Sequence, residues 1–472
     1  MDEIELSLDF WWDMSVQLAG KKVLVMGLGR FGGGVDAVRF AANAGAHVVV
    51  TDKATREQLQ DSIGQVSDLA DIEFHLGRHD AEDFATADVI VANPAVPPDN
   101  EFLQIARRHG RTVTSQVGLF FQSCPAPIIG ITGANGKSTT TSLTAHLLER
   151  ARPPASQGVY EKVWLSGNIG DRPLLTILDQ ITPRDLVVLE ISSFQVEQLM
   201  EARKAPKVAL LTNLTPNHLD RYGTFEAYCA AKEALFTFQA LDAASPAISI
   251  FNAEDEVART WFRKYQGQRG RTCLQFRADD VSAEVQAVYA LPGRANRSNL
   301  AAAMAIAKCF GVTDRSIQDC LAQFKALPHR LELVGDRNGV RWYNDSKATT
   351  PEGTMVALAA FECPKVLIAG GYDKHTPFDE LGKKIVCSAK AAILIGQTAR
   401  QIADAIHAAS ENVHQPDVQF AGSLAEAVEV ANRIAVPRDV VLLSPACASY
   451  DMFENYQQRG RLFAELVQRL GA

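Results

Sequence analysis

The residues best suited to chemistry form one run, residues 130–140, which reads Gly-Ile-Thr-Gly-Ala-Asn-Gly-Lys-Ser-Thr-Thr. Glycines let backbone N–H groups crowd around phosphate oxygens, and the N-terminus of a following helix adds partial positive charge. Lys137 would neutralise the outer phosphates of a nucleotide, and the Ser138 hydroxyl would hold a magnesium ion. The run therefore predicts a loop that binds the phosphates of a nucleoside triphosphate.

The residues on either side of this loop support that interpretation. The apolar residues 126–129 favour a buried strand, and residues 142–149 carry apolar side chains at helical spacing. Strand, glycine loop and helix is the order that a phosphate loop requires. The strict Walker spacing would place a glycine where Ile131 stands, so the loop is a variant. The simpler alternative is a glycine-rich turn that only joins the strand to the helix.

A second glycine pattern lies near the start of the chain. Residues 22–26 read as a buried parallel strand, Gly27–Gly32 follows with the spacing G-x-G-x-x-G, and Asp52 ends the next strand, residues 47–51. This βαβ pattern is typical of dinucleotide binding, with the acid on a ribose hydroxyl. It suits an NAD-dependent oxidoreductase, but the same turn binds any diphosphate, including that of a nucleotide sugar.

Three polar residues lie at or after the ends of two later predicted strands, residues 186–190 and 208–212. Glu190 ends the first of these strands and could complete a magnesium site with Ser138, because ligands collect at the carboxyl ends of parallel strands. His218 follows the second strand, and Lys232 lies on a helix among small and apolar residues. A semi-buried lysine is costly unless it is paired, neutral or modified. Each residue also has an ordinary interpretation as a helix cap, a loop histidine or a surface lysine.

In the last third of the chain, predicted strands again lead into polar loops. Strand candidates at 341–343, 366–369, 392–395 and 440–443 alternate with helical stretches. Three of these strands lead into the polar loops Asn344–Thr349, Gly370–Lys374 and Ser444–Phe453. Such loops converge on one edge of a sheet, and their lysines, aspartates and serines suit an anionic amino acid. Cys447 could be a nucleophile, but with no histidine nearby we interpret it as a packed thiol.

Length and composition limit the class of protein. A chain of 472 residues is too long for one core, so we expect three domains, at 1–115, 116–326 and 327–472. Strands alternating with helices indicate an α/β fold with mainly parallel sheets. The net charge of −8 disfavours a nucleic-acid partner. Eight cysteines without a C-x-x-C pair, no long apolar run and an acidic start at 1–12 favour a cytoplasmic enzyme.

Taken together, these motifs resemble the ATP-dependent Mur ligases of peptidoglycan synthesis. The resemblance covers nearly the whole chain and depends on motifs that occur in family order: residues 130–140, 165–168, 190–195, 217–221, 231–232, 327–330, 344–349, 370–374 and 444–453. It implies a Rossmann-like N-terminal domain for the UDP part of a nucleotide sugar, a central P-loop-type ATPase domain, and a Rossmann-like C-terminal domain for the amino acid.

The resemblance also implies an activity. It is strongest to the branch that adds D-glutamate to UDP-N-acetylmuramoyl-L-alanine through an acyl phosphate, with ATP and two Mg²⁺ ions. The same chemistry with another acceptor, such as L-glutamate, is the alternative. We expect a monomer that binds these small molecules and neither nucleic acid nor a membrane. A non-catalytic nucleotide-sugar-binding module and an NAD-dependent dehydrogenase are the rival classes; the second would leave the phosphate loop unexplained.

The resemblance assigns roles to individual residues. Lys137, Asn168, His218, Lys232 and Lys347 would be catalytic. The metal ligands would be Ser138, Glu190, His218 and a carbamylated Lys232. ATP would contact Gly133, Ala134, Asn135, Gly136, Lys137, Ser138, Thr139, Asn296, Asn299, Arg330 and Asp345. The UDP substrate would contact Gly27, Leu28, Gly29, Arg30, Asp52, Lys53 and Asn93, and glutamate would contact Lys347, Thr349, Lys374, Ser449 and Tyr456.

The chain departs from the family pattern at three places. Ala295 stands before Asn296 where the family has histidine, residues 93–98 (Asn-Pro-Ala-Val-Pro-Pro) replace a serine-proline-glycine turn, and Tyr456 replaces an aromatic residue without a hydroxyl. None of these changes removes an expected catalytic group.

Overall fold

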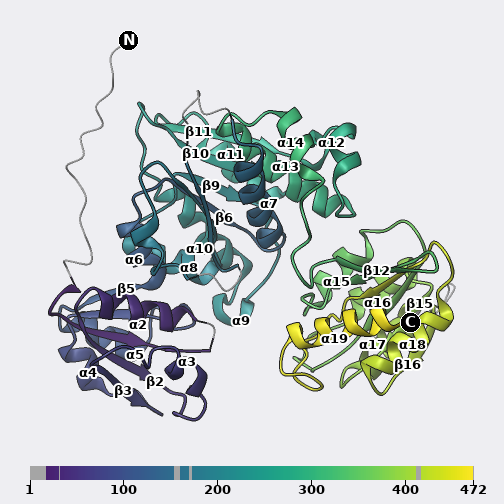
Figure 1. The fold of residues 1–472 in the computed structure, drawn as a ribbon, viewed down its shortest axis with the longest axis horizontal. Coiled ribbons are helices and arrows are strands. Elements are labelled where there is room, and N and C mark those ends of the chain that lie inside the picture. The colour runs from purple at the N-terminus through teal and green to yellow at the C-terminus, as the bar shows by residue number, and fades with distance from the viewer. Residues whose placement is uncertain (1–17, 31, 154–159, 170–172, 411–415, 471–472) are drawn as a thin grey trace. The chain divides into compact units, whose positions relative to one another are not determined.

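The computed structural model describes residues 18–30, 32–153, 160–169, 173–410 and 416–470. Residues 1–12, where we expected no secretory signal, lie outside this description. The described residues form three sheets, each flanked by helices, and the chain divides into two compact units (Figure 1). The first unit holds residues 1–277 and 301–319, and the second holds residues 278–300 and 320–472. The predicted α/β class is confirmed.

The N-terminal sheet of the first unit is parallel, in the order β3-β2-β1-β4-β5. Its strands are β1 (Lys22–Met26), β2 (His47–Asp52), β3 (Ile72–Leu76), β4 (Val89–Ala92) and β5 (Thr112–Ser115). Its helices are α2 (Gly33–Asn43), α3 (Gln60–Gly64), α4 (Ala81–Thr86), α5 (Glu101–Arg108) and α6 (Gln116–Ser123). The chain reverses its strand order between β1 and β4, where α/β sheets place ligands.

The central sheet of the first unit is also parallel, in the order β11-β10-β9-β6-β8-β7. Its strands are β6 (Ile128–Thr132), β7 (Val163–Gly167), β8 (Leu186–Glu190), β9 (Val208–Leu211), β10 (Ala247–Asn252) and β11 (Arg271–Phe276). Its helices are α7 (Lys137–Arg150), α8 (Ser193–Ala202), α9 (Leu219–Tyr222), α10 (Phe225–Thr237) and α11 (Glu256–Tyr265), with a 3₁₀ turn, η2, at Leu178–Gln180. β6 and β8 are fully buried, which fits their apolar composition.

One carboxylate joins the two sheets of this unit. Asp36, on α2 of the N-terminal sheet, is 4% exposed and accepts backbone N–H groups from Leu174, Leu175 and Thr176 at 2.7 to 3.0 Å. The Thr176 hydroxyl and the Gln116 amide also donate to it, at 2.9 and 2.6 Å. A buried carboxylate is tolerated only when such donors replace water. Asp36 therefore fixes α2 against residues 174–176.

The sheet of the second unit has the order β12-β13-β17-β14-β15-β16. Its strands are β12 (Glu332–Arg337), β13 (Val340–Asn344), β14 (Lys365–Ala369), β15 (Ala391–Leu394), β16 (Asp417–Phe420) and β17 (Val440–Leu443). Only β12 pairs antiparallel among these described strands. Its helices are α15 (Pro351–Leu358), α16 (Asp379–Ser388), α17 (Ala399–Ala409), α18 (Leu424–Ile434) and α19 (Tyr456–Arg469). Alternate residues of β14, such as Leu367 and Ile368, enter separate cores on the two sheet faces.

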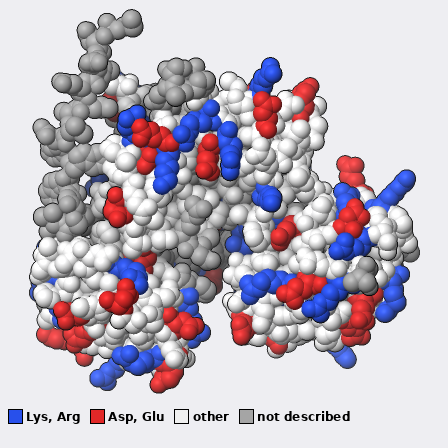
Figure 2. Space-filling model, in the orientation of Figure 1, with Lys and Arg blue, Asp and Glu red and all other residues white. Residues whose placement is uncertain are grey.

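The segment that joins the sheets is helical. It contains η3 (Ala278–Asp280), α12 (Ala283–Val288), α13 (Arg294–Cys309) and α14 (Asp314–Leu321). In the described parts of the chain, no helix has the length and apolar composition needed to cross a membrane. On the face that Figure 2 shows, basic and acidic side chains are interspersed on both units.

Candidate active site

The phosphate loop lies between β6 and α7 in the predicted order. Gly133 has φ 148°, and a Cβ atom there would lie 1.9 Å from the Thr212 hydroxyl, so only glycine fits. Gly136 caps α7 with φ 81° and has no side chain to block its N-terminus. Lys137 Nζ donates to the carbonyl oxygens of Gly133 and Ala134 at 3.0 and 2.9 Å. The lysine ammonium thus lies over the loop that would receive the phosphates.

Two residues that sequence reasoning did not assign to the site hold this loop from β9. Thr212 donates its hydroxyl to Asn135 O at 2.7 Å. Asn213 accepts the Asn135 N–H at 2.9 Å through Oδ1, and its carbonyl accepts the Ala134 N–H at 2.8 Å. The sequence did contain a signal for these two residues: both are polar and directly follow an apolar strand, β9, which pairs with β6. These bonds give the loop its shape before any ligand binds.

Glu190 lies at the carboxyl end of β8, beside Ile131 of β6. The residue is 2% exposed; Asn168 Nδ2 donates to its Oε1 at 3.2 Å, and its Oε2 is buried with no hydrogen-bond partner among the described residues. A buried carboxylate oxygen without a partner costs free energy comparable to a lost hydrogen bond or more. Gly167 brings β7 so close that a Cβ there would lie 2.4 Å from Glu190 O. The strand pair therefore presents one unsatisfied carboxylate oxygen.

Lys232 is a buried lysine on α10. It is 1% exposed, its Nζ donates to Thr132 Oγ1 at 3.1 Å, and Thr132 in turn donates to Ile191 O at 2.8 Å. Burial, and then the positive charge of Lys137, hold the pKa of Lys232 well below its usual range. The described residues place no carboxylate within ion-pair distance of this amine. Burial therefore favours the neutral, nucleophilic form of the Lys232 amine.

His218 caps the short helix α9 with φ 53°. The residue as a whole is exposed, but its ring lies 4.9 Å from the Phe194 ring and 6.5 Å from the Tyr228 ring. Desolvation of the ring lowers the pKa of His218, and the positive charges of Lys232 and Lys137 act in the same direction. A neutral imidazole is the form that can bind a cation.

Glu190, Ser138 and His218 are the candidate ligands for a cation in this part of the chain. No group of three His, Cys, Asp or Glu in the described parts of the chain is placed to hold a metal ion. Among the predicted ligands in the first unit, Glu190 offers an Oε2 without a hydrogen-bond partner in the described residues, and the Ser138 hydroxyl and the His218 ring are the other predicted donors. This mixed oxygen-rich set fits Mg²⁺, which keeps several waters and takes one or two protein carboxylates beside a substrate phosphate.

The N-terminal glycine loop is shaped by Asp52 and Asn93. Asp52 accepts the N–H groups of Gly29 and Ala54 at 3.1 and 2.9 Å. Gly27 has φ 90°, and a Cβ there would lie 2.9 Å from Asn93 Cβ. Of the other residues predicted for the UDP substrate, Leu28 is buried while Arg30 and Lys53 are exposed. Both carboxylate oxygens of Asp52 thus accept backbone N–H groups of the loops after β1 and β2.

The second unit gathers the polar loops that follow β13 and β17. Asp345 is buried, accepts the Ser444 hydroxyl at 2.8 Å and the Leu331 N–H at 3.2 Å, and burial raises its pKa to about 7. Lys347 Nζ lies 5.4 Å from the centre of the Tyr456 ring. Ser449 is 2% exposed, Thr349 is half-buried and Lys374 is exposed.

A buried arginine that sequence reasoning missed joins these loops. Arg459, on α19, donates to the Ser346 hydroxyl at 3.0 Å and to the carbonyl oxygens of Ser346, Cys447 and Ala448 at 2.9 to 3.3 Å. Burial lowers the pKa of Arg459 to about 10, so it stays charged at neutral pH. Cys447 is itself buried 3.1 Å from the Thr398 hydroxyl, and burial raises its pKa to about 11, which fits a packed thiol.

The residues predicted for ATP are divided between the two units. The phosphate loop, 133–139, lies in the first unit. Four residues lie in the second: Asn296 and Asn299, which share a 3.3 Å hydrogen bond, together with Arg330 and Asp345. Asn168, Glu190, His218 and Lys232 are all in the first unit, while Lys347, Thr349, Lys374, Ser449 and Tyr456 are in the second.

The fold and the site define a phosphate-loop, nucleotide-binding α/β protein with a second glycine loop. The sequence matches the N-terminal domain of MurD-like Mur ligases over residues 21–115, the Mur ligase middle domain over 131–289, and the glutamate ligase domain of Mur ligases over 329–447. It is 40% identical to the UDP-N-acetylmuramoylalanine--D-glutamate ligase of Roseiflexus sp. (strain RS-1), covering 96% of this chain and 99% of that relative. The chain therefore belongs to the Mur ligase family.

Two further comparisons agree. The ligase of the same name from Thermoanaerobacter pseudethanolicus is 35% identical, with 96% of this chain and all of that relative covered. Among solved structures, a pseudomurein peptide ligase type C from Methanothermus fervidus matches 96% of this chain and all of its own chain, with a TM-score of 0.51 and 16% identity. The second likeness concerns the fold alone.

Proposed function

We propose that this protein joins D-glutamate to the L-alanyl carboxylate of UDP-N-acetylmuramoyl-L-alanine, with conversion of ATP to ADP and phosphate. The observation that carries the proposal is full-length similarity, at 40% identity, to a ligase named for that reaction. The Mur ligase family uses ATP and Mg²⁺. The phosphate loop, Glu190 and Lys232 supply the matching chemistry in the first unit.

The reaction needs ATP because a carboxylate is a poor electrophile. A carboxylate oxygen of the L-alanyl group attacks the γ-phosphorus of ATP, ADP leaves, and an acyl phosphate forms. The amine of D-glutamate then attacks the carbonyl carbon, the tetrahedral intermediate expels phosphate, and the new amide loses a proton. Such transfers depend on positioning and on neutralisation of phosphate charge more than on covalent catalysis.

In the first unit, we assign the phosphates of ATP to the loop 133–139. Backbone N–H groups of the loop and of the first turn of α7 would bind the phosphate oxygens. Lys137 would move from its present carbonyl partners to the β- and γ-phosphates, and Asn168 would contact the transferring phosphoryl group. Ser138 and Glu190 would hold one Mg²⁺, and His218 with a modified Lys232 a second; bound Mg²⁺ would neutralise phosphate charge.

The environment of Lys232 supports the proposed modification. A neutral amine can attack carbon dioxide, which forms a carbamate and releases one proton. This step converts a buried cation, which is costly, into an anionic oxygen ligand for a metal ion. The low pKa of Lys232 and its proximity to Thr132, one strand from Glu190, support this assignment.

The remaining residues divide between the two other substrates. Gly27, Leu28, Gly29, Arg30, Asp52, Lys53 and Asn93 are assigned to the UDP substrate, with Leu28 contributing only its backbone because its side chain is buried. Lys347, Thr349, Lys374, Ser449 and Tyr456 are assigned to D-glutamate. Asn296, Asn299, Arg330 and Asp345 are assigned to ATP. The domain limits at 115/116 and 326/327, a monomer and a cytoplasmic location stay predictions.

Oxygen transfer tests this function and its mechanism together. The substrate carboxylate is labelled with ¹⁸O, and the phosphate released in the presence of ATP, Mg²⁺ and D-glutamate is analysed by mass spectrometry. An acyl phosphate requires one labelled oxygen in each phosphate, because the attacking oxygen leaves with phosphorus. Unlabelled phosphate would show that water attacks ATP, and would contradict the proposed ligase.

A further inference from the structure

A single arginine joins elements of the first unit that come from distant parts of the chain. Arg221 Nη2 contacts Glu197 Oε2 of α8 at 2.5 Å, and Nη1 donates to the carbonyl oxygens of Pro94 and Ala95 at 3.4 and 3.3 Å. The centre of its guanidinium lies 4.2 Å from the centre of the Phe194 ring. Arg221 therefore ties α8 to the loop after β4, residues 93–98, which we call the β4 loop.

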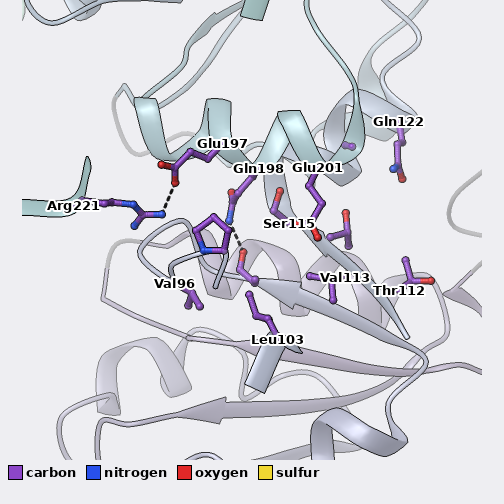
Figure 3. Close-up of a pocket in the computed structure, with 14 residues that line it drawn as sticks. Val96, Leu103, Thr112, Val113, Ser115, Gln122, Glu197, Gln198, Glu201 and Arg221 are labelled. Atoms are coloured by element: carbon purple, nitrogen blue, oxygen red, sulfur yellow. Dashed lines mark hydrogen bonds and ion pairs between the residues drawn. The ribbon is translucent and has the colours of Figure 1, made fainter. Parts of the chain in front are cut away.

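The β4 loop borders a cavity of the first unit. A cavity of about 270 Å³ lies between this loop, β5 and α8, and Val96, Pro98, Leu103 and Gln198 are among the residues that line it (Figure 3). Gln198 crosses to the last residue of β4, with its Nε2 donating to Ala92 O at 3.0 Å. Beside this cavity, Gln198 and Arg221 make polar bridges to β4 and its loop, while Val96 of the loop packs against the neighbouring apolar core.

Arg221 is also connected directly to His218 through the α9 turn. The two residues belong to one turn, α9 with its cap, and the Arg221 N–H donates to His218 O at 3.0 Å. Phe194, which Arg221 covers, lies against the His218 ring with 4.9 Å between ring centres. A displacement of Arg221 would therefore move both the backbone and the ring contact that orient His218.

We propose that Arg221 is a positioning residue that links the β4 loop, which carries the UDP-substrate residue Asn93, to His218 at the metal side of the site. The inference rests on the proposed function, because it assigns the loop to substrate and His218 to Mg²⁺. It predicts that loss of Arg221 weakens the binding of nucleotide sugar and of Mg²⁺ together. A role in stability alone would change neither constant in the folded enzyme.

The chain supplies a matched control in Arg107. This arginine also contacts a glutamate of α8, Glu201, at 2.6 Å, and also donates to the β4 loop, at Pro98 O, 2.7 Å. Its side chain is 29% exposed and that of Glu201 41%, against 15% and 13% for Arg221 and Glu197, so the control pair is more strongly screened by solvent. Arg107 makes the same two kinds of bond without contacting Phe194 or the α9 turn.

The experiment measures the KM for UDP-N-acetylmuramoyl-L-alanine and the half-saturating Mg²⁺ concentration, with D-glutamate and ATP saturating. We expect Arg221→Ala to raise both constants at least about tenfold, because misplacement of positioning groups has effects of that size or more. Arg221→Lys, which keeps the charge but not the planar fork, should lie between Arg221→Ala and the wild type. For Arg107→Ala, both constants should stay within about threefold of the wild type.

The outcomes separate the two proposals. Wild-type constants in folded Arg221→Ala, or equal increases in Arg107→Ala, would overturn the role of Arg221. If Arg221→Ala does not fold, folded Arg221→Lys with unchanged constants would overturn it equally. A wild-type enzyme that releases no phosphate with D-glutamate would instead refute the proposed function.

Discussion

The Nζ atom of Lys232 lies 3.1 Å from the hydroxyl oxygen of Thr132, in a buried position with no carboxylate within ion-pair distance in the described parts of the chain. The amine has lost most of its hydration and has gained one neutral partner. Burial therefore lowers its pKa, and a neutral amine can become a carbamate.

This relationship predicts chemical rescue. Lys232→Ala should abolish phosphate release and leave a space that a short carboxylate can enter, so acetate should restore part of the activity. The measurement is phosphate release over an acetate titration. Lys207→Ala, a change at a partly exposed lysine bonded to Ser245, should stay active and should not respond to acetate. Inactivity of Lys232→Ala at every acetate concentration would count against the carbamate.

Glu190 should set the requirement for Mg²⁺. Its buried Oε2 has no partner among the described residues, and a cation would satisfy it. Glu190→Gln keeps the side-chain size and removes the charge, so the half-saturating Mg²⁺ concentration should rise at least about tenfold. Glu161→Gln makes the same chemical change on an exposed side chain paired with Arg184, and should leave the constant unchanged. An equal Mg²⁺ requirement in the two variants would remove Glu190 from the metal site.

Much of the fold could be predicted because buried parallel strands are continuous apolar runs. The predicted strands at 22–26, 186–190 and 440–443 have the bounds of β1, β8 and β17. Strands with polar residues were missed: β3, β5, β7, β11, β12 and β16 mix polar with apolar side chains. In β3, for example, Glu73 and His75 interrupt the apolar pattern.

The residues of the candidate site also fall into two groups, those that the sequence predicted and those that only the structure revealed. Local motifs revealed the phosphate loop, Glu190, His218 and Lys232. No local motif indicated Asp36 or Arg459, because each acts through backbone groups that only the folded chain brings near. The backbone donors to Asp36, for instance, lie about 140 residues further along the chain. Tertiary contacts of this kind leave no local spacing to read.

Asp36 should be important for stability rather than for chemistry. Asp36→Ala leaves three backbone N–H groups without their acceptor, so the free energy of unfolding should fall by about 3 kcal/mol. Urea denaturation of the purified variants measures this change. Asp68→Ala removes an exposed carboxylate paired with Arg39 and should lower the free energy of unfolding much less than Asp36→Ala does. Equal losses in the two variants would show that the bonds of Asp36 do not stabilise the interface with residues 174–176.

Asp345 should make the stability of the second unit depend on pH. Its pKa is raised to about 7 in the folded chain, so folding favours the protonated acid. This contribution is complete below the unfolded pKa and is lost as the pH rises through 7. Between pH 5.5 and 8 the free energy of unfolding should therefore fall by about 2 kcal/mol through this group. Denaturation at both pH values, with Asp345→Asn as the non-titrating control, measures it. The same fall in Asp345→Asn would assign the effect to other groups.

The most direct test of the central claim is phosphate release from ATP in the presence of UDP-N-acetylmuramoyl-L-alanine, with D-glutamate, with L-glutamate or with no amino acid. The proposed function predicts sustained release with D-glutamate and little release in the other two reactions. Release that requires a different amino acid would keep the ATP site and the acyl-phosphate chemistry but would contradict the assigned acceptor. Equal release in all three reactions would contradict the ligase itself.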